Sequence, residues 1–284
     1  MLKNFFATVL SFSTLLISAP ALAIIDGQKL EQLSDLRAST VFVFIFSQNS
    51  QRICTGTLIA KDLVLTAGHC SPDESKNEQV AIGFGLDANS AFSNNGKLKS
   101  YGTVVRTAVV EQYDRNKPQG SLTVQYDLAI MQFKGSLPAE AKPRALPEAP
   151  FEISKASTLV LSGYGFNNEI NPDESALRMK TYPASQIADA VYDHTKRQAY
   201  DFPGAIIIEQ PEGGVCDGDS GGPLFVQEGP KLTMVGVASY VLNVNATVKD
   251  GSQLCRGNAV FVDIRANLGW IKAASQALQN TSSM

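Results

Sequence analysis

The sequence has little of several features that would place it in a functional class. Its net charge of −3 shows no excess of basic residues, which argues against a nucleic-acid-binding protein. No Cys-x-x-Cys pair, calcium loop or other metal motif occurs among its 284 residues, so we expect neither a metal nor a cofactor. A content of 44% hydrophobic and 18% charged residues is typical of a soluble globular protein with one or two domains.

Long apolar runs are also missing, and beyond residue 23 none could span a bilayer, so we expect no stable membrane association. Residues 1–23 have the form of a signal peptide: Lys3 gives a positive start, residues 5–17 are mostly apolar, and residues 21–23 (ALA) form a small-x-small cleavage site. The alternative is an N-terminal membrane anchor. Cleavage predicts a mature chain that begins at Ile24 and is secreted or periplasmic.

Only four cysteines are present, which in an exported protein predicts two disulfides. Four cysteines allow three pairings, and the residues by themselves do not choose among them. Free buried thiols are the alternative, although an oxidising compartment disfavours them.

One stretch, residues 213–223 (GGVCDGDSGGP), carries a serine among glycines and a proline. Glycine permits backbone angles and close approaches that other residues resist, so such a loop can present Ser220 and aim backbone N–H groups at one point. A serine hydroxyl is a weak nucleophile and needs a base that is itself oriented by a third group.

The chain supplies both groups. His69 lies in residues 66–70 (TAGHC), after an apolar run, and Asp127 heads another run in residues 126–130 (YDLAI). His194 has no surrounding motif and suits a surface position, and Asp114, the other nearby carboxylate, lacks the apolar run that follows Asp127.

Together these motifs, in the order His69, Asp127, Ser220, resemble the chymotrypsin/trypsin family of serine proteases. The resemblance implies an all-β fold of two antiparallel six-stranded β-barrels with a C-terminal α-helix. It also implies that Ser220 is the nucleophile, His69 the general base and acid, and Asp127 the group that orients His69. The backbone N–H groups of Gly218 and Ser220 would form the oxyanion hole.

The domain organisation follows the same resemblance. We expect a first barrel with His69 and Asp127 over residues 24–137, a proline-rich linker over 138–150, a second barrel with Ser220 over 151–262 and a helix over 263–279. Apolar and β-branched runs predict strands at 41–46, 54–59, 63–66, 104–110, 232–240 and 259–262, and polar loops surround the apolar residues 80–84. Residues 159–165 resemble the family's strand that leads to a Gly-aromatic-Gly turn. Residues 185–200 have helical character.

The family resemblance also selects the disulfides Cys54–Cys70 and Cys216–Cys255. The start at Ile24 is similar to the family's Ile-Val-Gly-Gly start, which implies that a freed Ile24 amine pairs with Asp219 and shapes the oxyanion hole. No propeptide separates the signal from Ile24, so we expect signal peptidase itself to make the activating cut. An apolar start by coincidence is the alternative.

Local alignment with the family assigns a substrate pocket. Its base maps to Gly214, where trypsin-like members carry an aspartate, and larger residues than glycine at Val241 and Ala259 would narrow it. We therefore expect small aliphatic P1 residues, with a loose preference. Glu212 or Asp217 reaching the pocket would instead favour basic residues. The full set of predicted substrate-binding positions is Gly214, Val215, Ser239, Tyr240, Val241 and Ala259.

These features predict a secreted serine endopeptidase, a monomer that acts on protein or peptide substrates and can meet protein inhibitors. Two other classes remain open. A catalytically inactive relative would serve as a binding module, although all three triad residue types are kept. An esterase would use the same triad, but the Gly-x-Ser-x-Gly arrangement and the Ser, Asp, His order of α/β-hydrolases are both missing.

Overall fold

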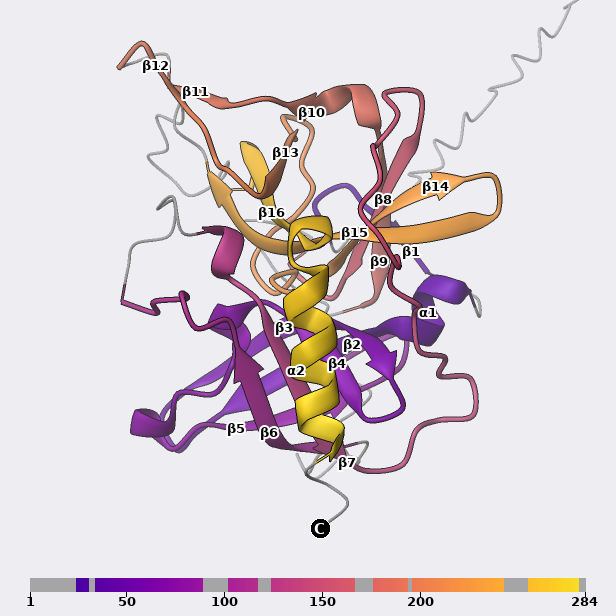
Figure 1. Ribbon diagram of the computed structural model, residues 1–284, viewed down its shortest axis with the longest axis vertical. Helices are drawn as coiled ribbons and strands as arrows, with labels where there is room; N and C mark the ends of the chain where they lie inside the picture. The colour runs from indigo at the N-terminus through magenta and orange to yellow at the C-terminus, as the bar shows by residue number, and fades with distance from the viewer. Residues whose placement is uncertain are drawn as a thin grey trace, which may run out of the picture.

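A computed structural model describes residues 24–30, 34–88, 102–116, 124–166, 176–193, 196–242 and 255–280. The predicted signal at residues 1–23 and His194 lie outside this set. Two β-sheet units form the bulk of the described chain, and a C-terminal helix lies along them (Figure 1).

The first unit is a closed antiparallel barrel of six strands in the order β2-β3-β4-β7-β6-β5. A short helix, α1 (Asp35–Ser39), leads into it. Its strands are β2 (Thr40–Phe46), β3 (Gln51–Ala60), β4 (Leu63–Thr66), β5 (Gln79–Gly83), β6 (Gly102–Val109) and β7 (Ala129–Lys134). The strands predicted between residues 41 and 110 are all confirmed, with boundaries shifted by a few residues.

The second unit is an eight-stranded antiparallel sheet in the order β1-β9-β8-β14-β15-β16-β13-β10. Its strands are β1 (Gln28–Lys29), β8 (Thr158–Gly163), β9 (Arg178–Pro183), β10 (Ile187–Ala188), β13 (Ala205–Glu209), β14 (Pro223–Glu228), β15 (Lys231–Leu242) and β16 (Asn258–Asp263). The chymotrypsin-like fold class is confirmed. Two-residue strands, β1 and β10, extend the six longer strands of this unit at its two edges.

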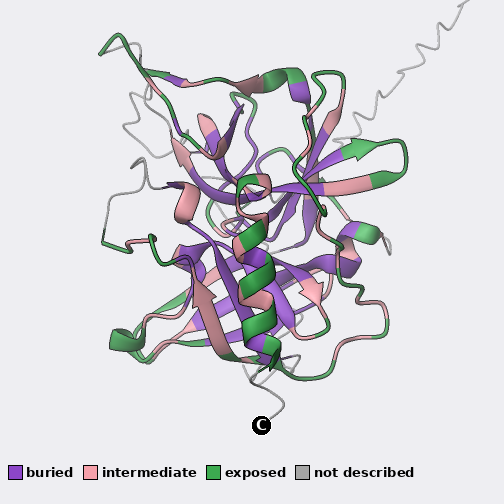
Figure 2. Cartoon of the chain, in the orientation of Figure 1, coloured by how far each residue is buried: buried purple, intermediate pink, exposed green. Residues whose placement is uncertain are grey.

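Continuous apolar runs form strands here because both of their faces are buried. In β2, Val43 and Ile45 point into the core of the first barrel, whereas Phe42 and Phe44 pack in a separate cluster with Tyr164 from the second unit. Tyr164 meets the Phe42 ring edge to face, with 5.6 Å between ring centroids. Buried residues accordingly fill the interior of the barrel and the middle of the sheet, while exposed residues gather in the loops (Figure 2).

The C-terminal helix is confirmed but begins later than predicted. A single 3-10 turn, Ile264–Ala266, is capped by the Asp263 carboxylate, and α2 then runs over Leu268–Asn280. Ile271 and Leu278 lie seven residues apart on one face and are both buried. Asp263 ends β16 and accepts the Arg265 N–H, which explains why the helix does not start at residue 263.

The helical character predicted for residues 185–200 is wrong. After one 3-10 turn at Ala184–Gln186, β10 pairs with β13, and β11 (Val191–Asp193) pairs with β12 (Gln198–Tyr200). Val191 is fully buried against Phe202 and Ile207. Strand pairing and this packing override the local helical spacing, because tertiary contacts outweigh weak propensities.

The linker region holds no strand or helix between residues 135 and 157. The Lys142 N–H donates to the Ala38 carbonyl and the Arg144 N–H to the Leu58 carbonyl, so this stretch lies against the first barrel. The domain boundaries themselves remain a prediction. None of the helices in the described ranges has the length and apolarity needed to cross a membrane.

Candidate active site

Strand register brings His69 and Asp127 to the same end of the first barrel. In the antiparallel pair of β4 and β7, Thr66 lies opposite Ala129. The chain leaves β4 after Thr66 and turns into the 3-10 helix Gly68–Cys70, and it enters β7 just after Asp127. Two residues 58 positions apart in sequence therefore meet at one barrel edge.

Two contacts join the Asp127 carboxylate to His69. The His69 backbone N–H donates to Oδ1 at 2.8 Å, and the ring Nδ1 lies 2.9 Å from Oδ2. The Ser239 hydroxyl of β15 donates to the same Oδ2 at 2.5 Å. Burial by itself would raise the pKa of Asp127, but the charge of His69 and these three hydrogen bonds outweigh burial and hold its pKa below the usual value. Asp127 is thus kept as a carboxylate that fixes Nδ1 of His69 as a donor.

The Ser220 loop lies between the two sheet units. The Thr55 N–H of β3 donates to the Ser220 carbonyl, and the Gly221 N–H donates to Ala238 of β15. Gly221 has a φ of +83°, and a Cβ there would overlap Thr66 Oγ1 and the Thr55 carbonyl, so only glycine fits. These contacts hold the Ser220 loop against the first barrel, and they fix the position of Ser220 relative to His69.

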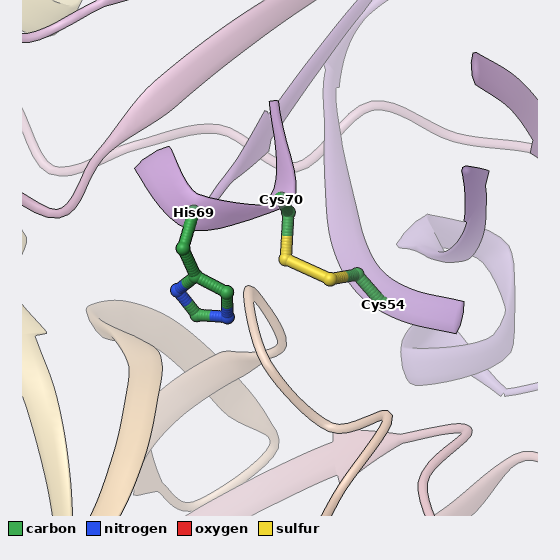
Figure 3. A group of neighbouring side chains, drawn as sticks. All are labelled: Cys54, His69 and Cys70. Atoms are coloured by element: carbon green, nitrogen blue, oxygen red, sulfur yellow. A yellow bond between two sulfur atoms is a disulfide. The ribbon is translucent and has the colours of Figure 1, made fainter. Parts of the chain in front are cut away.

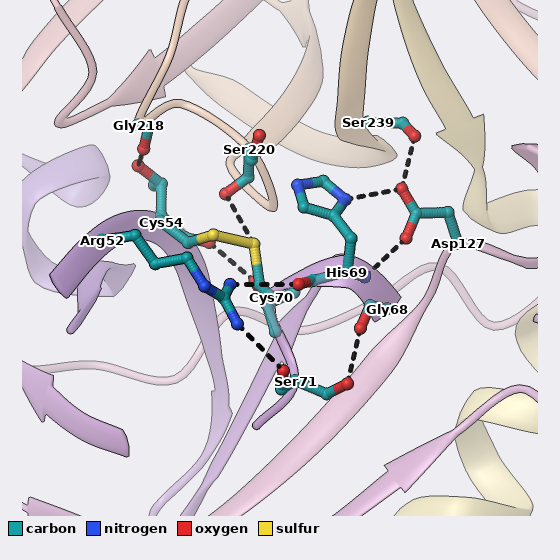
Figure 4. The surroundings of a disulfide bond; sticks show 12 residues. Arg52, Cys54, Gly68, His69, Cys70, Ser71, Asp127, Gly218, Ser220 and Ser239 are labelled. Atoms are coloured by element: carbon teal, nitrogen blue, oxygen red, sulfur yellow. Dashed lines mark hydrogen bonds and ion pairs between the residues drawn. A yellow bond between two sulfur atoms is a disulfide. The ribbon is translucent and has the colours of Figure 1, made fainter. Parts of the chain in front are cut away.

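Figure 4 shows Ser220 on the side of the imidazole that faces away from Asp127. The side chain of His69 is 22% exposed, and Ser220 is partly exposed, so both can meet a ligand from outside. Among the described residues, no hydrogen bond joins Ser220 Oγ to His69. Such bonds often tighten only when a substrate binds.

The proposed oxyanion donors have free N–H groups. In the described part of the chain, neither the Gly218 N–H nor the Ser220 N–H donates a hydrogen bond to another protein group. Gly218 has a φ of +94°, and a Cβ there would lie 2.8 Å from Gly165 Cα. The Phe166 N–H donates to the Asp217 carbonyl at 2.7 Å, which is the other end of the peptide group that carries the Gly218 N–H. The Thr55 hydroxyl donates to the Gly218 carbonyl at 2.9 Å.

Both predicted disulfides are confirmed. Cys54 is bonded to Cys70, and Cys216 to Cys255. The first ties the residue after His69 to β3, and Figure 3 shows the His69 ring beside it. Cys54, His69 and Cys70 are close enough in space to suggest a metal cluster, but the two sulfurs are bonded to each other, so this group does not offer thiolate ligands.

Asp219 is a fully buried carboxyl group next to Ser220. The N–H groups of Gly165 and Cys216 donate to its two oxygens at 2.8 and 3.0 Å. Burial raises the pKa of Asp219 to about 7, because these two bonds only partly offset the loss of water. Within the described ranges, no lysine, arginine or histidine side chain forms an ion pair with it.

Ile24 and Ile25 are both buried against the residues that precede Asp219 in the chain. Ile25 packs against the Cys216–Cys255 disulfide, and its N–H donates to the Gly214 carbonyl at 2.9 Å. Ile24 is fully buried among residues of the second unit, including Val215. The N-terminal segment therefore lies against the loop that carries Asp219.

Residues 31–254 match the family model described as Trypsin. The chain belongs to the trypsin family. It is 30% identical to Trypsin 5G1 of Aedes aegypti over 67% of the chain and 66% of that protein. It is 25% identical to Chymotrypsin-like elastase family member 1 of Macaca fascicularis over 77% of each. The match to Coagulation factor XII of Rattus norvegicus is 26% over 77% of the chain but only 36% of that protein.

In this member of the trypsin family, two side chains that the sequence did not indicate, Tyr182 and Gln210, lie next to Gly214, the predicted base of the substrate pocket. Gly214 has a φ of +156°, and a Cβ there would overlap Tyr182 Oη and Gln210 Oε1. The buried Gln210 amide accepts the Val215 N–H and donates to the Val215 and Cys255 carbonyls, at 2.7–2.9 Å. The Tyr182 hydroxyl donates to the Gly213 carbonyl. No local motif marks either residue.

The residues predicted to form the walls of the substrate pocket lie on β15, on β16 and in the Ser220 loop, and their side chains have different contacts. Val241 lies opposite Ala259 in the β15–β16 pair, with Val241 half-buried and Ala259 buried. The Val215 side chain is buried in the core of the second unit, and the Ser239 side chain points to Asp127. Tyr240 packs edge to face on Phe202, with ring centroids 6.5 Å apart.

A guanidinium also holds the backbone at His69, which the sequence did not indicate. Arg52 donates to the His69 carbonyl at 3.1 Å and forms an ion pair of 2.7 Å with the buried Glu78 (Figure 4 shows the contact with His69). Burial would raise the pKa of Glu78, but the hydrogen bonds from the Asp73 N–H and Arg52 and the charge of Arg52 hold it below its usual value. The alternative carboxylate, Asp114, instead accepts the Asn116 N–H in its own turn.

Proposed function

We propose that this trypsin-family chain is a secreted serine endopeptidase that works through Ser220, His69 and Asp127. The observation that carries the proposal is the orientation of His69: Asp127 binds Nδ1, and Ser220 lies on the opposite side of the ring. An imidazole held this way can take a proton at Nε2, because its Nδ1 is already committed as a donor.

The chemistry follows from that arrangement. Ser220 Oγ attacks the peptide carbonyl while Nε2 of His69 takes its proton. The tetrahedral oxyanion is stabilised by the free N–H groups of Gly218 and Ser220, and each such donor typically contributes about 3 kcal/mol. The protonated His69 then gives its proton to the leaving amine, and water hydrolyses the acyl-enzyme by the same steps in reverse. Asp127 stays ionised throughout and stabilises the imidazolium.

Activation is proposed to depend on the Ile24 amine. Signal peptidase would cut after Ala23 and free this amine, which would pair with Asp219 and stabilise the loop that holds Gly218. The support is that Asp219 is buried without a cationic partner among the described residues and that Ile24 and Ile25 lie against the same loop. An export route through residues 1–23 would place the enzyme in the periplasm or outside the cell, where the two disulfides are stable.

The proposed P1 preference is for small aliphatic side chains. Gly214 carries no aspartate, and Tyr182 and Gln210 occupy the space into which a side chain at Gly214 would project. Val241 and Ala259 oppose each other where open pockets of the family have glycine. A basic preference through Glu212 or Asp217 is the alternative, and both residues are exposed.

The partners implied are protein or peptide substrates and protein inhibitors, with the enzyme acting as a monomer. A catalytically inactive binding module and an esterase remain the competing functions. A serine-directed phosphonate that labels Ser220 would reject the binding module. Cleavage of a folded protein in addition to a small ester would reject the esterase.

The deciding experiment is to incubate the purified chain beginning at Ile24 with a peptide library and map the cleavage sites by mass spectrometry. Ser220→Ala is the matched control, expected to lose activity by several orders of magnitude while keeping its fold. Cleavage after Ala or Val that disappears in the control supports the proposal. Cleavage after Lys or Arg would keep the triad but reject the pocket assignment, and an unchanged rate in the control would reject the triad.

A further inference from the structure

Lys180 of β9 binds three backbone carbonyls that come from two distant segments. Its ammonium donates to Ile25 O at 3.1 Å, to Glu212 O at 2.8 Å and to Gly213 O at 2.9 Å. An ammonium group has three hydrogens, so all of them are used. Lys180 therefore joins the N-terminal segment, residues 24–27, to the loop that precedes Cys216.

Other contacts at Gly213 and Gly214 also hold the N-terminal segment and this loop together. The Ile25 N–H donates to Gly214, and the Tyr182 hydroxyl donates to Gly213. A Cβ at Gly213 would overlap the Ile25 side chain, so the two segments touch directly. None of these contacts, and none of those of Lys180, uses the α-amine of Ile24.

The charged side chains around Lys180 act on the pKa of its ammonium group in opposite directions. The carboxylates of Asp26 and Glu212 stabilise its ammonium form, whereas Arg256, which pairs with Asp26 at 3.3 Å, opposes it. Burial outweighs the two carboxylates and lowers the pKa of Lys180 below its usual value. A half-buried ammonium that loses water must find other acceptors, and the three carbonyls supply them.

We propose that Lys180 is a positioning residue for activation, whose ammonium docks residues 24–27 onto the loop at Glu212 and Gly213 by contacts that do not need the Ile24 amine. Docking by Lys180 would hold Ile24 against the loop that carries Asp219, both before and after the cut. The newly freed amine then only completes an interface that already exists. The role of docking in catalysis rests on the proposed Ile24–Asp219 pair, whereas docking itself does not.

Hydrogen–deuterium exchange tests docking without reference to activity. The protein is the full mature chain carrying Ser220→Ala, which prevents self-cleavage. Lys180→Met removes the ammonium but keeps a similar length, and Lys231→Met makes the same change at the exposed first residue of β15. We expect exchange at Ile25 and Gly213 to accelerate about tenfold in Lys180→Met, the size of effect that losing hydrogen bonds to a charged group produces.

Peptides from β2 and β3 serve as the internal standard in the same samples. Faster exchange confined to the two docked segments, with Lys231→Met unchanged, supports the proposal. Equal exchange at Ile25 and Gly213 in wild type and Lys180→Met overturns it. Acceleration everywhere, including β2 and β3, would show a general loss of stability and also overturns it.

The pH dependence of kcat/KM tests the consequence for catalysis. A free α-amine titrates near pH 8, and docking energy from Lys180 helps to keep the amine paired and protonated above that value. In Lys180→Met we expect kcat/KM at pH 7 to fall and the midpoint of the alkaline fall to move down toward about 8. Lys180→Arg, which keeps the charge, should recover part of both. An identical alkaline midpoint in wild type and Lys180→Met overturns the catalytic role. A wild-type rate with no alkaline fall would instead reject the Ile24–Asp219 pair, leaving docking to the exchange result.

Discussion

The buried Asp219 carboxyl group gives a quantitative test of activation. Its pKa is raised to about 7 from an ordinary value of 3.8 when no amine is paired with it. The folded state then binds a proton more tightly than the unfolded state. The stability that this proton confers is fully present below pH 3.8 and is lost as pH rises through about 7.

At about 1.36 kcal/mol per pH unit, that difference corresponds to about 4 kcal/mol of unfolding free energy. A chain that begins at Ala23 and cannot place its amine beside Asp219 should therefore lose up to about 4 kcal/mol between pH 4 and pH 7.5. A chain that begins at Ile24 should lose much less, because its protonated amine stabilises the ionised carboxylate. The paired amine has a raised pKa, so this advantage persists below about pH 8 and fails as pH rises through the raised value.

Urea unfolding at the two pH values, with both chains carrying Ser220→Ala, measures the effect. Asp219→Asn is the matched control, since a carboxamide has no charge to pair and should make the two chains respond alike to pH. The reasoning is refuted if the chains starting at Ala23 and Ile24 show the same pH dependence. It is equally refuted if their difference survives in Asp219→Asn.

Three further changes test other parts of the site. Ser239→Ala removes one donor from the buried Asp127 carboxylate, so the pKa of Asp127 should rise and the unfolding free energy at pH 7 should fall by about 1–3 kcal/mol, the cost of losing a hydrogen bond to a buried charged group; an unchanged unfolding free energy would contradict this role. Gly221→Ala places a Cβ against Thr66 Oγ1 at a φ of +83°, and it should lower the unfolding free energy by about 1–3 kcal/mol in urea titrations, with no change arguing against the described loop. Val241→Gly should widen the pocket and shift library cleavage toward larger P1 residues about 10- to 200-fold, and an unchanged profile would remove Val241 from the pocket.

The site residues could be found from sequence because each lies in a short motif. Ser220 sits in a glycine-rich loop and His69 and Asp127 adjoin apolar runs, and the resemblance carried by those motifs also selected the disulfide pairing. The roles of these residues in catalysis remain a proposal. What the motifs could not show is the third donor to Asp127, since Ser239 lies 112 residues away and reaches it only through the packing of the second unit on the barrel.

The sequence by itself determined the strands whose residues are apolar on both faces and the order of the motifs along the chain, because both are local patterns. Tertiary structure alone decided that β10, β11 and β12 form where the sequence favours a helix. It also decided that Gln210 and Tyr182 lie next to Gly214 and that Lys180 binds Ile25 and Gly213. The physical reason is that a side-chain contact between distant segments depends on strand register and on how the two units pack. A single residue such as Lys180 has no local pattern that records the carbonyls it will meet.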